Sequence, residues 1–84
     1  MRQVRLTLSD AFSQVVAKHR VKKSLSRAAL ARLAGLHQTY IGLLERGERT
    51  PNLDTANAIA QALSKPLGEL IAEAGKLQKP SKRK

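Results

Sequence analysis

A short segment near the middle of the chain carries an amide, a hydroxyl and a guanidinium at helical spacing. On a helical wheel of about 100° per residue, Gln38, Thr39 and Arg46 share one arc with Gly42 and Leu43. A glutamine amide pairs with adenine N6 and N7, and a threonine methyl can contact a thymine methyl. Gly42 has no side chain, so a nucleic-acid backbone or sugar could come close there. The pattern predicts a helix whose amide and hydroxyl side chains, Gln38 and Thr39, face base edges.

The opposite half of the same wheel is more apolar. It holds His37, Tyr40, Ile41, Leu44 and Glu45. We expect Ile41 and Leu44 to anchor the helix on the protein core, and Glu45 to be structural. Two interpretations stay open for His37, a cap or phosphate contact and a half-exposed residue, and two for Tyr40, packing at the core edge and phosphate contact.

The sequence offers little for other chemistry. It has no cysteine and only two histidines, His19 and His37, with no paired carboxylates beside them. No glycine-rich nucleophile turn is visible. We therefore expect no catalytic residue, no metal site and no cofactor, and we expect His19 to pack on its own helix.

The net charge of +10 in 84 residues indicates a polyanionic partner, with double-stranded DNA first and an anionic membrane surface second. The charge is uneven: residues 1–24 and 76–84 each carry a net charge of +5, and residues 25–75 are neutral. We expect a basic N-terminal arm over 1–7, one folded domain over 8–75 and a disordered basic tail over 76–84, since the tail is poor in apolar residues.

No segment approaches the roughly 18 apolar residues of a membrane span. The first residues lead into no apolar stretch, so we expect no signal peptide and a cytoplasmic location. Residues 4–8 alternate apolar and polar side chains, which fits both a short extended arm and a frayed terminus.

Helix signals repeat at short intervals, and strand signals are nearly absent. The predicted helix caps are Ser9, Ser26 and Asn52, and Gly35 and Gly47 are predicted to end helices. The expected helices run over about 10–20, 27–34, 38–46, 53–63 and 67–74, with core positions that include Leu8, Phe12, Val15, Val16, Leu30, Ala31, Leu33, Ala34, Leu53, Ala56, Ile59, Ala60 and Leu63. The fold class is all-α, with a helix-turn-helix unit centred on Gly35.

Residues 25–70 resemble the helix-turn-helix family of phage Cro and cI repressors, also called the Xre family. The most specific piece is Glu45-Arg46-Gly47 with Pro51 after it. The resemblance also rests on Leu25-Ser26, Leu30-Ala31, Gly35, Gln38, Ile41, Leu44, Arg49, Leu53, Ile59-Ala60, Ala62-Leu63 and Leu67-Gly68-Glu69-Leu70. It implies a five-helix, lambda-repressor-like domain. The stretch 37–49 is also similar to the small controller proteins of restriction–modification systems.

The resemblance also implies roles for individual residues. Gln38, Thr39 and Leu43 stand where the family reads base edges, although Leu43 replaces a residue that is often polar, and Gly42 replaces a frequent serine. Positions implied or considered for phosphate contact are Arg27, His37, Tyr40, Arg46 and Arg49. Tyr40 and Arg49 match positions that contact the phosphate backbone or adjacent bases, and Arg46 could instead be a solvated surface charge. Arg20 and Glu45 match a buried ion pair that orients helices more than it stabilises them.

These features predict a sequence-specific DNA-binding transcriptional regulator without enzymatic activity. It would act as a homodimer on a near-palindromic operator, with the third helix in the major groove. Leu67, Leu70 and Ile71 on the last helix are the predicted dimer contact. Two alternatives remain: an antitoxin or other module of the same fold that binds a partner protein, and a membrane-surface binder, which no strongly amphipathic basic helix supports.

Overall fold

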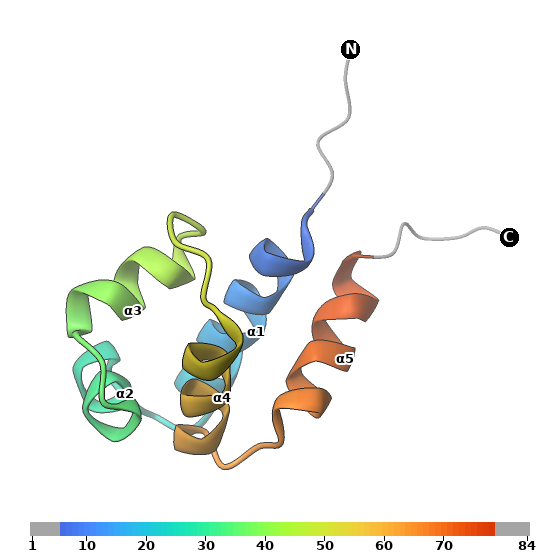
Figure 1. Ribbon diagram of the computed structural model, residues 1–84. Coiled ribbons are helices and arrows are strands. Elements are labelled where there is room, and N and C mark those ends of the chain that lie inside the picture. Colours follow the sequence, from blue (N-terminus) through green and yellow to red (C-terminus); the bar gives the residue numbers. More distant parts are fainter. Residues whose placement is uncertain (1–5, 79–84) are drawn as a thin grey trace, which may run out of the picture.

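Five helices follow one another in residues 6–78, the part of the chain that the computed structural model describes (Figure 1). The helices are α1 Leu8–Lys22, α2 Arg27–Ala34, α3 Gln38–Glu45, α4 Leu53–Ala62 and α5 Leu67–Gln78. Within those residues there is no strand. The predicted all-α class and the five-helix arrangement are confirmed.

Three helices begin at a polar side chain that accepts a hydrogen bond from the first turn. Ser26 accepts from the Ala29 amide and Asn52 from the Thr55 amide, as predicted. The prediction for α1 is wrong, because Thr7 accepts from the Asp10 amide and Ser9 already lies inside the helix. With Thr7 as the cap, α1 begins at Leu8.

Four chain reversals use a residue in the left-handed backbone region. Gly35 after α2 and Gly47 after α3 have φ of 73° and 77°. Serines take the same conformation after α1 and α4, where Ser24 and Ser64 have φ of 59° and 60°. A Cβ at Gly47 would also lie 3.1 Å from a carboxylate oxygen of Asp10, so this turn depends on glycine twice over.

The core lies where α1 and α5 pack together and where α2 meets α3 and α4. It is built mainly from Leu, Ile, Val and Ala side chains, namely Ala11, Phe12, Val15, Val16, Leu30, Ala31, Ile41, Leu44, Ala56, Ile59, Ala60, Leu63, Leu70 and Ala74. Three predicted core residues are exposed instead. Leu33 on α2 is 60% exposed and Leu53 at the start of α4 is 76% exposed. Leu8, also a predicted core position, lies at the surface of α1.

The last helix differs from the prediction in its length and in the face it buries. It continues to Gln78, beyond the expected domain boundary at residue 75, and the Gln78 side-chain amide donates to the Leu6 carbonyl at 3.3 Å. Leu70 is fully buried in the core of the same chain, so it is not available as a dimer contact and that prediction is wrong. Residues 1–5 and 79–84, most of the predicted arm and tail, lie outside the described residues.

An ionic cluster ties α1 to α5. The Glu73 carboxylate accepts from Lys18 Nζ and lies 2.8 Å from His19 Nε2. His19 is buried, and it packs between the two helices rather than on α1 alone. The hydrogen bond with His19, and then the one from Lys18, lowers the pKa of Glu73 from 4.5 to about 2.

We expect this cluster to make stability depend on acidity. Because the pKa of Glu73 is lower in the folded state, its stabilisation is complete above pH 4.5 and is lost as the pH falls towards 2. The Glu73→Gln variant lacks this stabilisation at every pH. The stability advantage of the natural chain over Glu73→Gln, measured by urea denaturation, should therefore shrink between about pH 5 and about pH 2.5.

The matched control is Glu69→Gln, which changes an exposed carboxylate on the same helix that forms no ion pair with the described residues. Its difference from the natural chain should stay small across this range. A constant advantage over Glu73→Gln down to pH 2.5 would show that the cluster does not act on stability.

Candidate nucleic-acid interface

The helix-turn-helix unit consists of α2, a short turn and α3. Gly35 leaves α2 in the left-handed conformation, and the Leu36 amide then donates to the Ala31 carbonyl at 2.8 Å. This turn sets the angle between the two helices. In Figure 1, α3 lies at the side of the bundle opposite α5, and it packs on α2 and α1.

The structure divides α3 into two faces much as the wheel predicts. Ile41 and Leu44 are fully buried and hold the helix on the core. Gln38 and Thr39 are exposed in the first turn, and Leu43 is half-buried beside them. Nothing from the chain's own described residues covers the amide and hydroxyl side chains, so they are free to meet a ligand.

Gly42 differs from the prediction. We expected an open position, but the residue is buried in the described structure. A Cβ placed there would lie 3.4 Å from Arg46 Nη1 and 4.0 Å from the Cδ atom of Arg27. Two arginine side chains therefore occupy the space over this glycine, and a sugar or backbone cannot approach until they move.

A nearly buried carboxylate, Glu45, holds two of the basic residues of this surface. Its oxygens accept from Arg20 Nε at 2.7 Å, from Arg20 Nη2 at 3.2 Å and from Arg27 Nε at 3.0 Å. Arg20 also donates to the Leu25 carbonyl at 2.7 Å, which ties the α1–α2 connection to the same group. The expected Arg20–Glu45 pair is present, and Glu45 in addition fixes the position of Arg27.

The link between Arg27 and Glu45 was not predicted. The two residues lie on different helices and are 18 positions apart, so no helical spacing connects them. Only the presence of two arginines and one glutamate around the helix-turn-helix unit signalled it. The half-exposed Arg27 guanidinium is thus anchored at one edge and open to solvent at the other.

The other predicted phosphate contacts occupy different environments. Tyr40 is half-buried and packs against the core, as one of its two interpretations expected. His37 precedes α3 and is exposed, but its side chain forms no capping hydrogen bond. Arg49 is exposed in the loop that follows α3. His37 and Tyr40 lie at the exposed first turn of α3, and Arg49 follows the opposite end of the helix.

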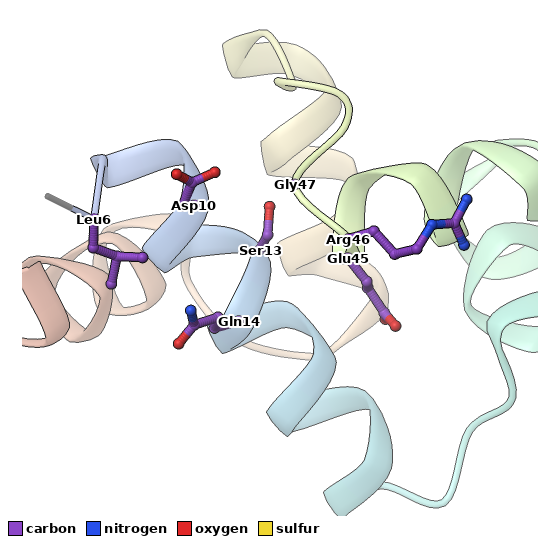
Figure 2. Close-up of a pocket in the computed structure, with 7 residues that line it drawn as sticks. All are labelled: Leu6, Asp10, Ser13, Gln14, Glu45, Arg46 and Gly47. Atoms are coloured by element: carbon purple, nitrogen blue, oxygen red, sulfur yellow. The ribbon is translucent and has the colours of Figure 1, made fainter. Parts of the chain in front are cut away.

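A small cleft separates α1 from the end of α3, and Figure 2 shows the side chains around it. The Asp10 carboxylate and the polar side chains of Ser13 and Gln14 line its α1 side. The Arg46 side chain points away from the cleft and runs back along α3 (Figure 2). An acidic lining does not suit an anion, so the basic groups that a phosphate would meet lie on the outer face of α3.

Within residues 6–78, no group of three His, Asp or Glu side chains lies close enough together to hold a metal ion. None of the five helices is both long and apolar enough to cross a membrane.

Comparison with known proteins identifies the family. The model of the helix-turn-helix family HTH_3 matches residues 16–70, which is more than half of the chain. The chain belongs to this family. Control protein C.SmaI of Serratia marcescens is 34% identical over 70 residues, which cover 83% of each protein. The chain is therefore a helix-turn-helix DNA-binding regulator and a homologue of the restriction–modification controller proteins.

Solved structures agree with this membership. The restriction–modification controller protein C.AhdI of Aeromonas hydrophila has a TM-score of 0.70 and 38% identity, over 73% of this chain and 92% of that one. The clp gene regulator ClgR of Corynebacterium glutamicum has a TM-score of 0.86 at 19% identity, over 93% of this chain and 100% of that one, which shows the shared fold. The relatives are named as control proteins and regulators, in line with the prediction of a non-enzyme.

Proposed function

We propose that this helix-turn-helix protein binds a specific DNA operator as a homodimer and controls the genes of a restriction–modification system. The observation that carries the proposal is the exposed first turn of α3, with Gln38 and Thr39 uncovered, in a unit that the family model matches. The controller proteins among its relatives favour this function over the antitoxin alternative.

In the proposed complex, α3 enters the major groove and α2 crosses the phosphate backbone. Gln38, Thr39 and Leu43 meet base edges and set the sequence preference. Arg27, His37, Tyr40 and Arg49 meet phosphates, together with the basic ends of the chain, and set the affinity and its dependence on salt.

The Gln38→Ala variant tests the base contact. If the amide reads one adenine, its removal should cost about 1–3 kcal/mol of discrimination at a single base pair in each half-site. Non-specific binding should hardly change, because phosphate contacts remain. We expect this pattern in gel-shift titrations with the preferred operator, selected from random DNA, and with its single base-pair variants.

Arg49→Ala is the control, since it removes an exposed cation without touching the first turn of α3. It should weaken binding to all DNA and lower the slope of log K against log salt by about two units, about one for each protomer of the dimer. An equal loss on every sequence for Gln38→Ala would remove that residue from the base-reading set. Failure of the natural chain to select any preferred site, even at low salt, would overturn the proposed function.

An apolar groove between α1, α4 and α5 is our candidate for the dimer contact. Leu8, Phe12, Leu53, Ala56 and Ile71 line it, and Leu53 and Leu8 are exposed apolar side chains. We name it the Leu53 groove. Of the dimer contact predicted from the sequence, the half-buried Ile71 lines this groove. The buried Leu70 does not, and the exposed Leu53 lies there instead.

A second copy is the occupant that fits the Leu53 groove. A domain of this size buries little surface by itself and gains from covering such side chains. Dimers of helix-turn-helix units in general bind two half-sites about 34 Å apart. Leu67, the third residue of the dimer contact predicted from the sequence, is half-buried on α5.

The Leu53→Asp variant should be monomeric in sedimentation at concentrations where the natural chain is a dimer. It should also bind a full operator more weakly, because the second half-site no longer adds affinity. Its fold should remain intact, since Leu53 makes few contacts within the chain. Leu33→Asp is the matched control: it changes a comparably exposed leucine on α2, outside the groove, and should remain dimeric. A dimeric Leu53→Asp would place the interface on another surface.

A further inference from the structure

The Arg46 side chain lies over the middle of α3 although the residue caps the end of that helix. Its Nη1 atom is 3.4 Å from the position a Cβ would take on Gly42, one turn earlier. Figure 2 shows the side chain extending back along the helix. Side chains on a helix lean towards its N-terminus, and an arginine is long enough to cover a full turn of about 5.4 Å.

Gly42 makes this position available. Gln38, Gly42 and Arg46 are spaced by four residues, so they form one stripe on the exposed side of α3. A side chain at position 42 would fill the centre of that stripe. Because glycine has no side chain, the centre of the stripe is empty. The Arg46 guanidinium occupies this space, one turn after Gln38.

The hydrogen bonds of Arg46 leave one edge of the guanidinium open. Its Nε donates to a Glu48 carboxylate oxygen at 3.2 Å, and the side chain is 54% exposed. The two terminal nitrogens form no hydrogen bond with the described residues. A pair of parallel N–H donors matches the O6 and N7 acceptors of guanine in the major groove.

We propose that Arg46 reads a guanine in each half-site and that Gly42 is the platform that positions it. This inference rests on the proposed function, because it assumes that α3 enters the major groove. From the sequence, Arg46 is either a phosphate contact or a solvated surface charge. The structure favours a base, because the guanidinium lies on the stripe of Gln38 rather than at the rim of the helix. The neighbouring Glu48 carboxylate would also be repelled by a phosphate.

The test uses 7-deazaguanine, which pairs normally but lacks the N7 acceptor. The operator is first selected from random DNA with the natural chain, and each guanine is then replaced in turn. The loss of a whole bidentate contact weakens binding roughly 5- to 150-fold, so we expect one replacement per half-site, which removes N7 and leaves O6, to cause part of that loss. The Arg46→Ala variant should bind the unmodified operator more weakly than the natural chain binds the modified one, and it should be insensitive to the same replacement.

The matched pair Gly42→Leu and Gly68→Leu tests the platform. A Cβ at Gly42 would meet Arg46 Nη1 at 3.4 Å, an ordinary contact distance, so a larger side chain is needed to displace the guanidinium, whereas a Cβ at Gly68 meets nothing within 4 Å. Gly42→Leu should reduce the sensitivity to 7-deazaguanine, and Gly68→Leu should keep it. Full sensitivity in Gly42→Leu would overturn the role of the glycine.

The outcomes separate this inference from the proposed function. If the natural chain selects no operator, the proposed function fails and the inference with it. If it selects one, but Arg46→Ala weakens all sequences equally and no guanine is sensitive to loss of N7, Arg46 contacts phosphate and only the inference is overturned.

Discussion

Replacing Leu70 by alanine is expected to lower the free energy of unfolding by about 2–5 kcal/mol. The side chain is 0% exposed and joins the core from α5, so its removal leaves a cavity among packed neighbours. Small domains have total stabilities of about 5–15 kcal/mol at most. The variant should therefore unfold at a clearly lower urea concentration than the natural chain.

The control for this variant is Leu67→Ala on the same helix. Leu67 is half-buried at the edge of the core, so less apolar surface is lost and the destabilisation should be clearly smaller. Leu70→Asp should unfold the chain rather than produce folded monomers, because a carboxylate would be buried without a partner. A folded, monomeric Leu70→Asp would mean that this leucine faces a partner after all.

Leu70 also shows where sequence periodicity stops being informative. The pattern on α5 identifies an apolar stripe of Leu67, Leu70 and Ile71, and the structure has that stripe. Periodicity does not say whether a stripe meets its own chain or another copy. That depends on how α5 packs on α1, which follows from the whole chain and not from one helix.

Leu33 and Leu53 were predicted to be buried but are exposed, which is the opposite of the error at Leu70. Both lie at core spacing, yet both are exposed, because each stands at the edge of its helix where no neighbouring element lies over it. The same limit applies to Thr7, whose capping role was assigned to Ser9, since both residue types are good N-caps and the packing of the helix decides where it begins. Ser24 and Ser64 end helices as glycine would, without the residue that signals such an end.

The α3 surface was predictable where one residue acts by itself. The exposure of Gln38 and Thr39 follows from the wheel alone, because Ile41 and Leu44 must face inward. The cover over Gly42 was not predictable. It depends on Arg27 and Arg46 crossing from either side, and long side chains place their charged ends by contacts that residue spacing does not encode.

The second large effect is expected at Glu45. The Glu45→Ala variant leaves Arg20, whose side chain is only 13% exposed, without its carboxylate. Breaking such a pair by removing one partner typically costs about 3–5 kcal/mol, because the remaining charge stays buried and unpaired. We expect a loss of this size in urea denaturation. Glu48→Ala, which breaks the exposed pair with Arg46, should change the stability by less than about 1 kcal/mol.

A double variant separates stability from orientation. Arg20→Met combined with Glu45→Leu replaces the buried pair by apolar groups of similar size, and such replacements are often neutral. Its stability should therefore recover most of what Glu45→Ala loses. Operator binding should stay impaired, because Arg27 no longer has the carboxylate that fixes its guanidinium at 3.0 Å, and ordering the free side chain on DNA costs entropy. Natural affinity in this stable double variant would show that the ion pairs of Glu45 with Arg20 and Arg27 act on stability alone. Weak affinity would show that the buried carboxylate positions the DNA-facing arginine of α2.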